Sequence, residues 1–140
     1  VKPALERKER ENGKPAIAIK INGNIITGRQ SDLMTAPGGA IINAVKFLSK
    51  IPDDMHLLSP IVLEPILKLK KEMGSGNRLL LSEVLTALSI CSVTNPIIER
   101  AIDELEKLRG CDAHSSYIID KGELNALKNL GINLTCDPRM

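Results

Sequence analysis

The clearest hydrophobic pattern in the chain is an alternation close to its N-terminus. Ile17, Ile19 and Ile21 lie two residues apart, so their side chains share one face of an extended strand. Asn22 and Gly23 follow, and both tolerate the positive φ angles that a two-residue type I′ turn requires before the next apolar run. The pattern therefore predicts an antiparallel β-hairpin.

Beyond this hairpin, apolar residues recur at helical spacing in several segments. Thr35 is a good capping residue, and Pro37 then falls in the first turn of a helix, where a missing N–H costs little. Pro65 should kink or split a second helix, because proline removes an internal hydrogen bond. Gly110 and Gly131 suit the left-handed conformation that ends a helix. The predicted helices cover approximately residues 36–51, 60–72, 82–91, 96–109 and 121–129.

Two further strands are predicted at residues 115–119 and 132–136, on either side of the last helix. The order of elements predicts an α/β fold, with a small mixed sheet of about four strands packed with five or six helices. The sheet would combine the N-terminal hairpin with a C-terminal β-α-β unit. Only a short helix connects the last two strands, so whether they are parallel neighbours stays open.

The length and net charge of the chain exclude several classes of protein. The 140 residues predict one domain over residues 1–140, with 1–14 as a charged lead-in. A net charge of +2 argues against a nucleic-acid binder that neutralises phosphates, and only Phe47 and Tyr117 could stack on bases. There is no apolar run of about eighteen residues, which argues against a membrane span.

Three cysteines, an odd number, do not suit a small disulfide-stapled secreted domain. The chain also opens without a basic segment followed by an apolar one, which a signal peptide would show. A cytoplasmic location is therefore expected.

Soft and borderline metal ligands occur at four positions, and such ligands suit tetrahedral zinc. The weak candidates for a metal site are His56, Cys111, His114 and Cys136. The alternative is that these are unrelated loop and strand residues, because the chain has no CxxC motif.

Other chemistry could use the same residues. Cys111 could pair with His114 as a thiolate and imidazolium, and Glu64 could act as an acid or base near His56. The catalytic candidates are thus His56, Glu64, Cys111 and His114, with capping and solvation as the structural alternative for the acidic residues. No cofactor is indicated.

An anion could bind at the start of the helix that follows Thr35, where N–H groups are free to donate. The candidate residues are Gly38, Gly39 and Arg29, with Lys46 as a further cation. The alternative is that the two glycines only permit close packing.

Long stretches of the sequence resemble the C-terminal part of a bacterial family catalogued as domain of unknown function 1846. They are IITGRQSDLMTA (25–36), the runs 41–72 and 81–119, and LGINLTCDP (130–138). The resemblance covers about residues 13–138. It implies that the chain is the C-terminal domain of a larger protein, whose N-terminal part has an α/β nucleotide-type fold. It implies no established reaction and no catalytic role for any residue.

The leading interpretation is a module that is not catalytic alone and that forms an interface or one wall of a cleft. The apolar helices at residues 41–51 and 96–109 would contact the N-terminal domain of the same protein or a second copy in a homo-oligomer. The alternative is half of a hydrolase or transferase site formed by the His, Cys and Glu candidates, with or without a metal.

Overall fold

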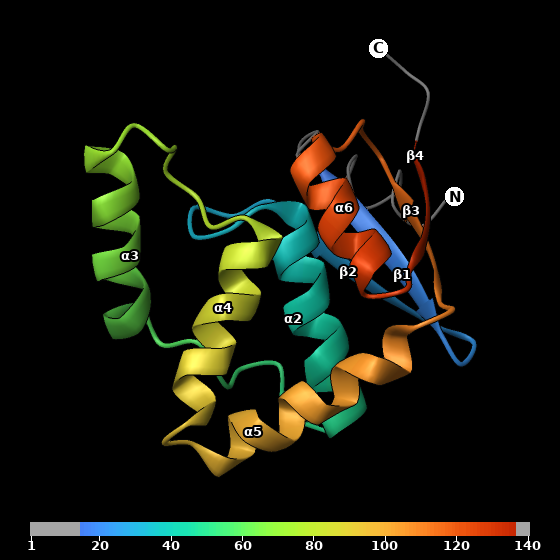
Figure 1. The fold of residues 1–140 in the computed structure, drawn as a ribbon. Helices are drawn as coiled ribbons and strands as arrows, with labels where there is room; N and C mark the ends of the chain where they lie inside the picture. The colour runs from blue at the N-terminus through green and yellow to red at the C-terminus, as the bar shows by residue number, and fades with distance from the viewer. Residues whose placement is uncertain (1–14, 137–140) are drawn as a thin grey trace.

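The computed structural model describes residues 15–136 (Figure 1). Its strands are β1 (Ala16–Ile21), β2 (Asn24–Arg29), β3 (Asp112–Ser115) and β4 (Asn133–Cys136). Its helices are α2 (Ala36–Ser49), α3 (Pro60–Glu72), α4 (Leu81–Ser92), α5 (Pro96–Asp103), the 3-10 helix η1 (Glu104–Leu108) and α6 (Lys121–Asn129). The lead-in predicted at residues 1–14 lies outside the described residues.

The strands form one mixed sheet in the order β2-β1-β3-β4. β1 pairs antiparallel with both β2 and β3, and β4 pairs parallel with β3. The open question about the last two strands is thereby answered, because α6 connects them as parallel neighbours. The α/β fold class is confirmed.

The hairpin forms as predicted. Asn22 and Gly23 have φ angles of 49° and 85°, as a type I′ turn requires, and the turn pairs Ile21 with Asn24. Ile17, Ile19 and Ile21 are buried on the face of the sheet that packs against the helices. Their alternation therefore fixes which face of β1 meets the core.

The strand predicted at residues 115–119 is placed too late in the chain, because β3 begins at Asp112 and ends at Ser115. The Ser115 hydroxyl donates to the Tyr117 carbonyl at 2.6 Å and accepts from the Tyr117 N–H at 3.1 Å. A serine that bonds locally to the backbone competes with the strand ladder. The chain therefore turns where the pattern of residue types predicted an extended segment.

Of the kink or split predicted at Pro65, the split is wrong, because α3 continues from Pro60 to Glu72 without a break. The carbonyl that loses its donor to Pro65 belongs to Ile61, in the exposed first turn, where solvent can replace the lost N–H. The helix predicted at residues 96–109 instead consists of two helix types in succession. It is α-helical to Asp103 and continues as η1 to Leu108.

Close packing holds α2 against β2. An alanine Cβ built on Gly28 would overlap the backbone N and Cα of Ala40, and one built on Gly39 would lie 3.2 Å from the Arg29 carbonyl oxygen. The absence of side chains here lets the helix lie directly on the strand. The largest fully buried side chains are Ile17, Ile19, Ile21, Ile41, Val45, Leu63, Leu79, Leu81, Val84, Leu88, Leu108 and Leu127.

Replacing Gly28 by alanine is expected to lower the free energy of unfolding by at least about 2 kcal/mol, because backbone atoms of Ala40 cannot move aside cheaply. Gly122→Ala in α6 is the matched control. An added Cβ there meets nothing within 4 Å, so alanine should stabilise the helix by about 0.5–1 kcal/mol. Urea unfolding of both variants measures the difference. Equal unfolding midpoints would contradict the close contact between α2 and β2.

Candidate functional site

The start of α2 is occupied by groups of the protein itself. The Thr35 hydroxyl accepts from the Gly38 N–H at 3.5 Å, and the Thr35 carbonyl accepts from the Gly39 N–H at 2.9 Å. Thr35 is thus the predicted cap, and the N–H groups of both glycines already have acceptors. Alternation along β2 turns the Arg29 side chain to the sheet face opposite the one that Gly28 presents to α2.

A buried carboxylate completes this helix start. Glu123 in α6 is only 6% exposed, and its Oε2 accepts from the Thr35 hydroxyl at 2.6 Å and from the Leu81 N–H at 2.9 Å. The negative charge lies where α2 and α4 both begin, which the helix dipoles favour. Burial and the nearby Glu123 carboxylate raise the pKa of Tyr117, so this phenol stays protonated. The carboxylate thus lies next to the cap of α2, whereas the Gly38 and Gly39 N–H groups bond to Thr35 itself.

Lys46 lies near the opposite, C-terminal end of α2. It is buried, and its Nζ donates to the Asp53 carbonyl at 3.1 Å, in the loop that follows the helix. This contact stabilises the C-terminal end of α2, far from Thr35.

The four metal candidates are not brought together. His56 is exposed in the loop before α3, Cys111 precedes β3, His114 lies within β3 and Cys136 ends β4. Within residues 15–136, no group of three or more His, Cys, Asp or Glu side chains is placed to hold a metal ion. Glu64 is exposed on α3, on the opposite side of the molecule from β3 and β4 (Figure 1).

Cys111 and His114 make separate contacts. The Cys111 thiol donates to the Lys107 carbonyl at 3.6 Å, whereas a hydrogen bond of 2.8 Å joins His114 Nδ1 to Thr135 Oγ1 on β4. Three residues of spacing along a strand place two side chains on opposite faces. Burial, and then the negative charge of Asp112, raise the pKa of the Cys111 thiol, the reverse of what an activated nucleophile needs.

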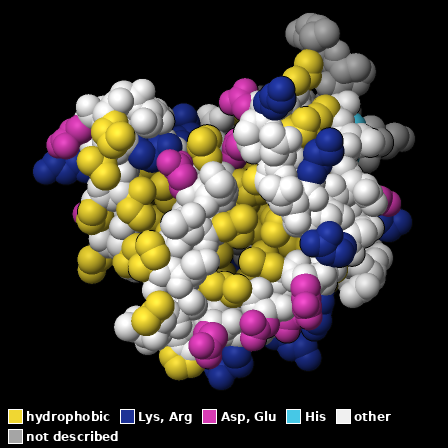
Figure 2. Space-filling model, viewed as in Figure 1, with side chains coloured by type: hydrophobic (Ala, Val, Ile, Leu, Met, Phe, Trp, Pro, Cys, Tyr) yellow, Lys and Arg dark blue, Asp and Glu magenta, His cyan; other side chains and the backbone are white. Residues whose placement is uncertain are grey.

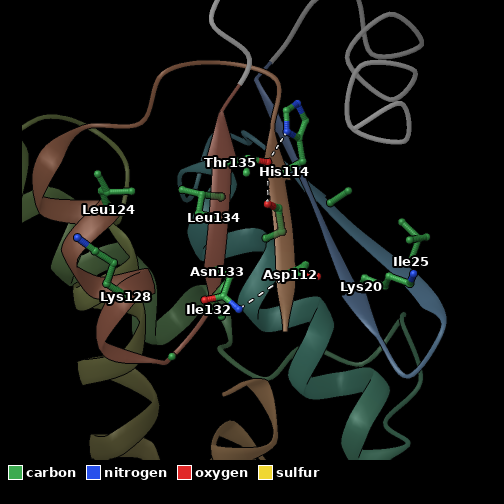
Figure 3. A pocket seen from close by; sticks show the side chains of 13 residues that line it. Lys20, Ile25, Asp112, His114, Leu124, Lys128, Ile132, Asn133, Leu134 and Thr135 are labelled. Atoms are coloured by element: carbon green, nitrogen blue, oxygen red, sulfur yellow. Dashed lines mark hydrogen bonds between the residues drawn. The ribbon is translucent and has the colours of Figure 1, made fainter. Parts of the chain in front are cut away.

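Polar side chains cover the sheet face that points away from the main core (Figure 3). The strand registers place Lys20, Asp112 and Asn133 in one row across this face, and His114 and Thr135 in the next. A hollow of about 910 Å³ lies here and continues around β4 to Leu124 and Lys128 of α6. Sequence analysis missed this arrangement because it placed the third strand too late in the chain.

The apolar segments predicted to form an interface are mostly used inside the fold. Ile41 and Val45 of α2, and Ile98 and Ala101 of α5, belong to the buried core. Exposed apolar side chains gather instead along α3 and near the turn between α4 and α5 (Figure 2).

α3 carries two apolar stripes. Leu63, Ile66 and Leu67 face the rest of the domain, and Leu63 is fully buried. The second stripe consists of Val62, Pro65, Leu69 and Met73, which recur at intervals of three and four residues. We call it the α3 outer stripe. Its members are exposed, Leu69 at 57% and Met73 at 69%.

One ion pair attaches α3 to α4 beside these apolar contacts. Lys70 Nζ donates to Glu83 Oε1 at 2.6 Å, and the lysine side chain is almost fully buried. The same carboxylate oxygen accepts from the Leu80 N–H at 2.8 Å and so caps α4. This pair fixes which face of α3 turns inward, and the outer stripe consequently faces solvent.

A family model described as "Domain of unknown function DUF1846, C-terminal" matches residues 1–140. The chain belongs to this family. A UPF0371 protein of Clostridioides difficile is 44% identical over 136 residues, which is 95% of this chain and 27% of that protein. A UPF0371 protein of Clostridium tetani is 47% identical over 127 residues, or 89% of this chain and 25% of that protein.

The DUF1846 C-terminal domain therefore spans about a quarter of the length of the curated relatives that it matches. These relatives carry a family name without a stated activity. No helix of residues 15–136 has the length and apolar character needed to cross a bilayer.

Replacing Glu123 by glutamine should lower the free energy of unfolding of this DUF1846 domain by about 2 kcal/mol. The amide keeps the shape but loses the charge that strengthens the bonds from Thr35 and Leu81. Glu106→Gln, at an exposed position of η1, is the control and should change the value by less than about 0.5 kcal/mol. Thermal or urea unfolding measures both. A neutral result for Glu123→Gln would contradict the role given to this carboxylate.

Thiol reactivity tests the environment of Cys111. In a variant with Cys91→Ser and Cys136→Ser, alkylation of Cys111 by iodoacetamide at pH 8 should be slower than that of a cysteine in a short unstructured peptide. Burial and the negative charge of Asp112 raise the pKa of this thiol, so less of it is thiolate at that pH. Asp112→Asn removes a negative charge, lowers this pKa and should increase the rate at pH 8 a few-fold. Asp54→Asn, in an exposed loop, should leave the rate unchanged. A rate at pH 8 equal to or above that of the peptide cysteine would contradict the raised pKa.

Proposed function

We propose that this domain is an interface module of a longer bacterial protein, and that the α3 outer stripe docks against the part of that protein outside this chain. The observation that carries the proposal is the second apolar stripe of α3. A helix at the surface of a free domain normally buries one apolar stripe and exposes polar residues elsewhere. α3 and its C-cap residue expose four apolar side chains in line, with Val62, Pro65 and Leu69 in the helix and Met73 directly after it.

Exposed apolar side chains also occur on α4 and in the turn after it. Ile90 at the end of α4 is 66% exposed, and Val93 in the following turn is 82% exposed. Apolar surface that goes beyond single scattered residues is typical of sites that another protein surface covers.

The length of the relatives supports the choice of occupant. About three quarters of each matched UPF0371 protein lies outside the region that resembles this chain. A covalently attached neighbour has a high effective concentration, so a modest apolar surface suffices to hold it. A second copy of the chain has no such advantage, and we treat it as an outcome of the test.

The same proposal includes a cytoplasmic location. The three cysteines are all free, with Cys91 in α4, Cys111 in the loop before β3 and Cys136 in β4, which suits a reducing compartment. The catalytic alternative has no comparable support among residues 15–136, because Glu64 lies on the opposite side of the fold from Cys111 and His114.

Cysteine labelling tests the docking surface directly. All three native cysteines are replaced by serine, and Leu69→Cys is compared between the isolated chain and the full-length protein. The thiol at position 69 should react at least about tenfold more slowly in the full-length protein, because the neighbouring part covers it. Lys68→Cys, on the charged face of the same helix, is the matched control and should react equally in both.

Two outcomes would overturn this proposal. Equal labelling of Leu69→Cys in the two proteins would show that the stripe stays exposed in the full-length protein. Protection in the isolated chain that increases with its concentration would show that a second copy, and not the rest of the protein, covers α3.

A further inference from the structure

The two edge strands of the sheet, β2 and β4, differ in the bonds that their outward backbone groups make. At the β2 edge, the Asn43 side chain in α2 donates to the Thr27 carbonyl at 2.9 Å. This bond occupies an outward backbone group that an added strand would need. The β2 edge is therefore guarded.

At the β4 edge, no side chain of residues 15–136 makes such a bond to the backbone of Leu134 or Cys136. The Asn133 N–H donates to the Cys111 carbonyl at 2.8 Å, on the β3 side, so the backbone of the next residue, Leu134, points to the open side. No hydrogen bond from another segment of residues 15–136 reaches these outward groups. The strand sequence NLTC contains neither a charged residue nor proline, which are two of the devices that block edge pairing.

The hollow next to β4 has the form that an added strand needs. It follows the strand and has an apolar side at Leu124 and Leu134, and a polar side at His114 and Thr135 (Figure 3). An extended segment presents its side chains alternately to the two faces of a sheet. A segment with alternating apolar and polar residues would therefore fill both sides.

Charge distinguishes between the possible occupants. Lys20 and Lys128 line the hollow, and its one acidic side chain, Asp112, accepts a hydrogen bond from Asn133 at 3.4 Å. A second copy of this strand would bring the same two lysines to the shared hollow, which like-charge repulsion disfavours. A segment with an acidic side chain next to Lys128 fits better.

We infer that the β4 edge is a strand-addition site, which an extended segment of the longer protein, alternately apolar and polar and carrying an acidic residue, joins as the fifth strand of the sheet. Main-chain hydrogen bonds to Leu134 and Cys136 would supply affinity, and the two sides of the hollow would supply selectivity. The source of the strand rests on the proposed function, whereas the site itself is at the opposite side of the molecule from α3 (Figure 1).

Hydrogen exchange measured by mass spectrometry tests this inference. A peptide that covers residues 132–136 should exchange at Leu134 and Cys136 about a hundredfold more slowly in the full-length protein than in the isolated chain. Lys128→Glu in the full-length protein should reverse most of this protection, while Arg100→Glu, an equal charge change on α5, should not. A peptide from the guarded edge, residues 24–28, should exchange equally in both proteins.

The possible failures are distinguishable. Fast exchange at residues 132–136 in the full-length protein, together with protected labelling at Leu69, overturns strand addition and leaves the docking of α3 intact. Slow exchange at residues 132–136 in the isolated chain also overturns strand addition, because the β4 edge is then already paired without the rest of the protein. If this protection increases with protein concentration, a second copy of the chain pairs with the edge. Protection that survives Lys128→Glu overturns the acidic partner residue.

Discussion

The arrangement of the helices depends on one buried carboxylate. Glu123 belongs to α6, yet it accepts hydrogen bonds from the cap of α2 at Thr35 and from the first residue of α4, Leu81. Removing a carboxylate from water is unfavourable, and the two donors together with the positive ends of two helices offset that cost. Three helices that are distant in the sequence are aligned at this point. With α2 also held on β2 at Gly28, the position of the core relative to the sheet is determined.

Local signals in the sequence predicted the local structure well. The type I′ turn at Asn22 and Gly23, the cap at Thr35 and the extent of α6 depend on neighbouring residues, so a single sequence contains the necessary information. The position of β3 could not be predicted in the same way. Its pairing partner, β1, lies about a hundred residues earlier, and a hydroxyl–backbone turn at Ser115 overrides the strand preference of the residues that follow.

The candidate sites show that residue type alone does not locate a functional site. His56, Glu64, Cys111 and His114 were selected because their side chains can do chemistry, but residue identity does not give distance, and the fold disperses them. The α3 outer stripe was missed for a different reason. Pro65 predicts a kink or a split in this helix, and a bent or split helix would not align Val62, Leu69 and Met73 on one face. A continuous helix makes that alignment visible.

The strand order has a consequence for biosynthesis. The Ala16 N–H donates to the Ser116 hydroxyl at 3.0 Å across 100 residues of sequence, and β1 is flanked on one side by a strand from the far end of the chain. Contacts of this separation close a long loop and form slowly. A ribosome adds about 5–20 residues per second, so the hairpin waits several seconds before β3 and β4 emerge. During that interval the edge of β1 that later pairs with β3 has no partner strand. A chaperone that binds extended backbone would bind at that edge.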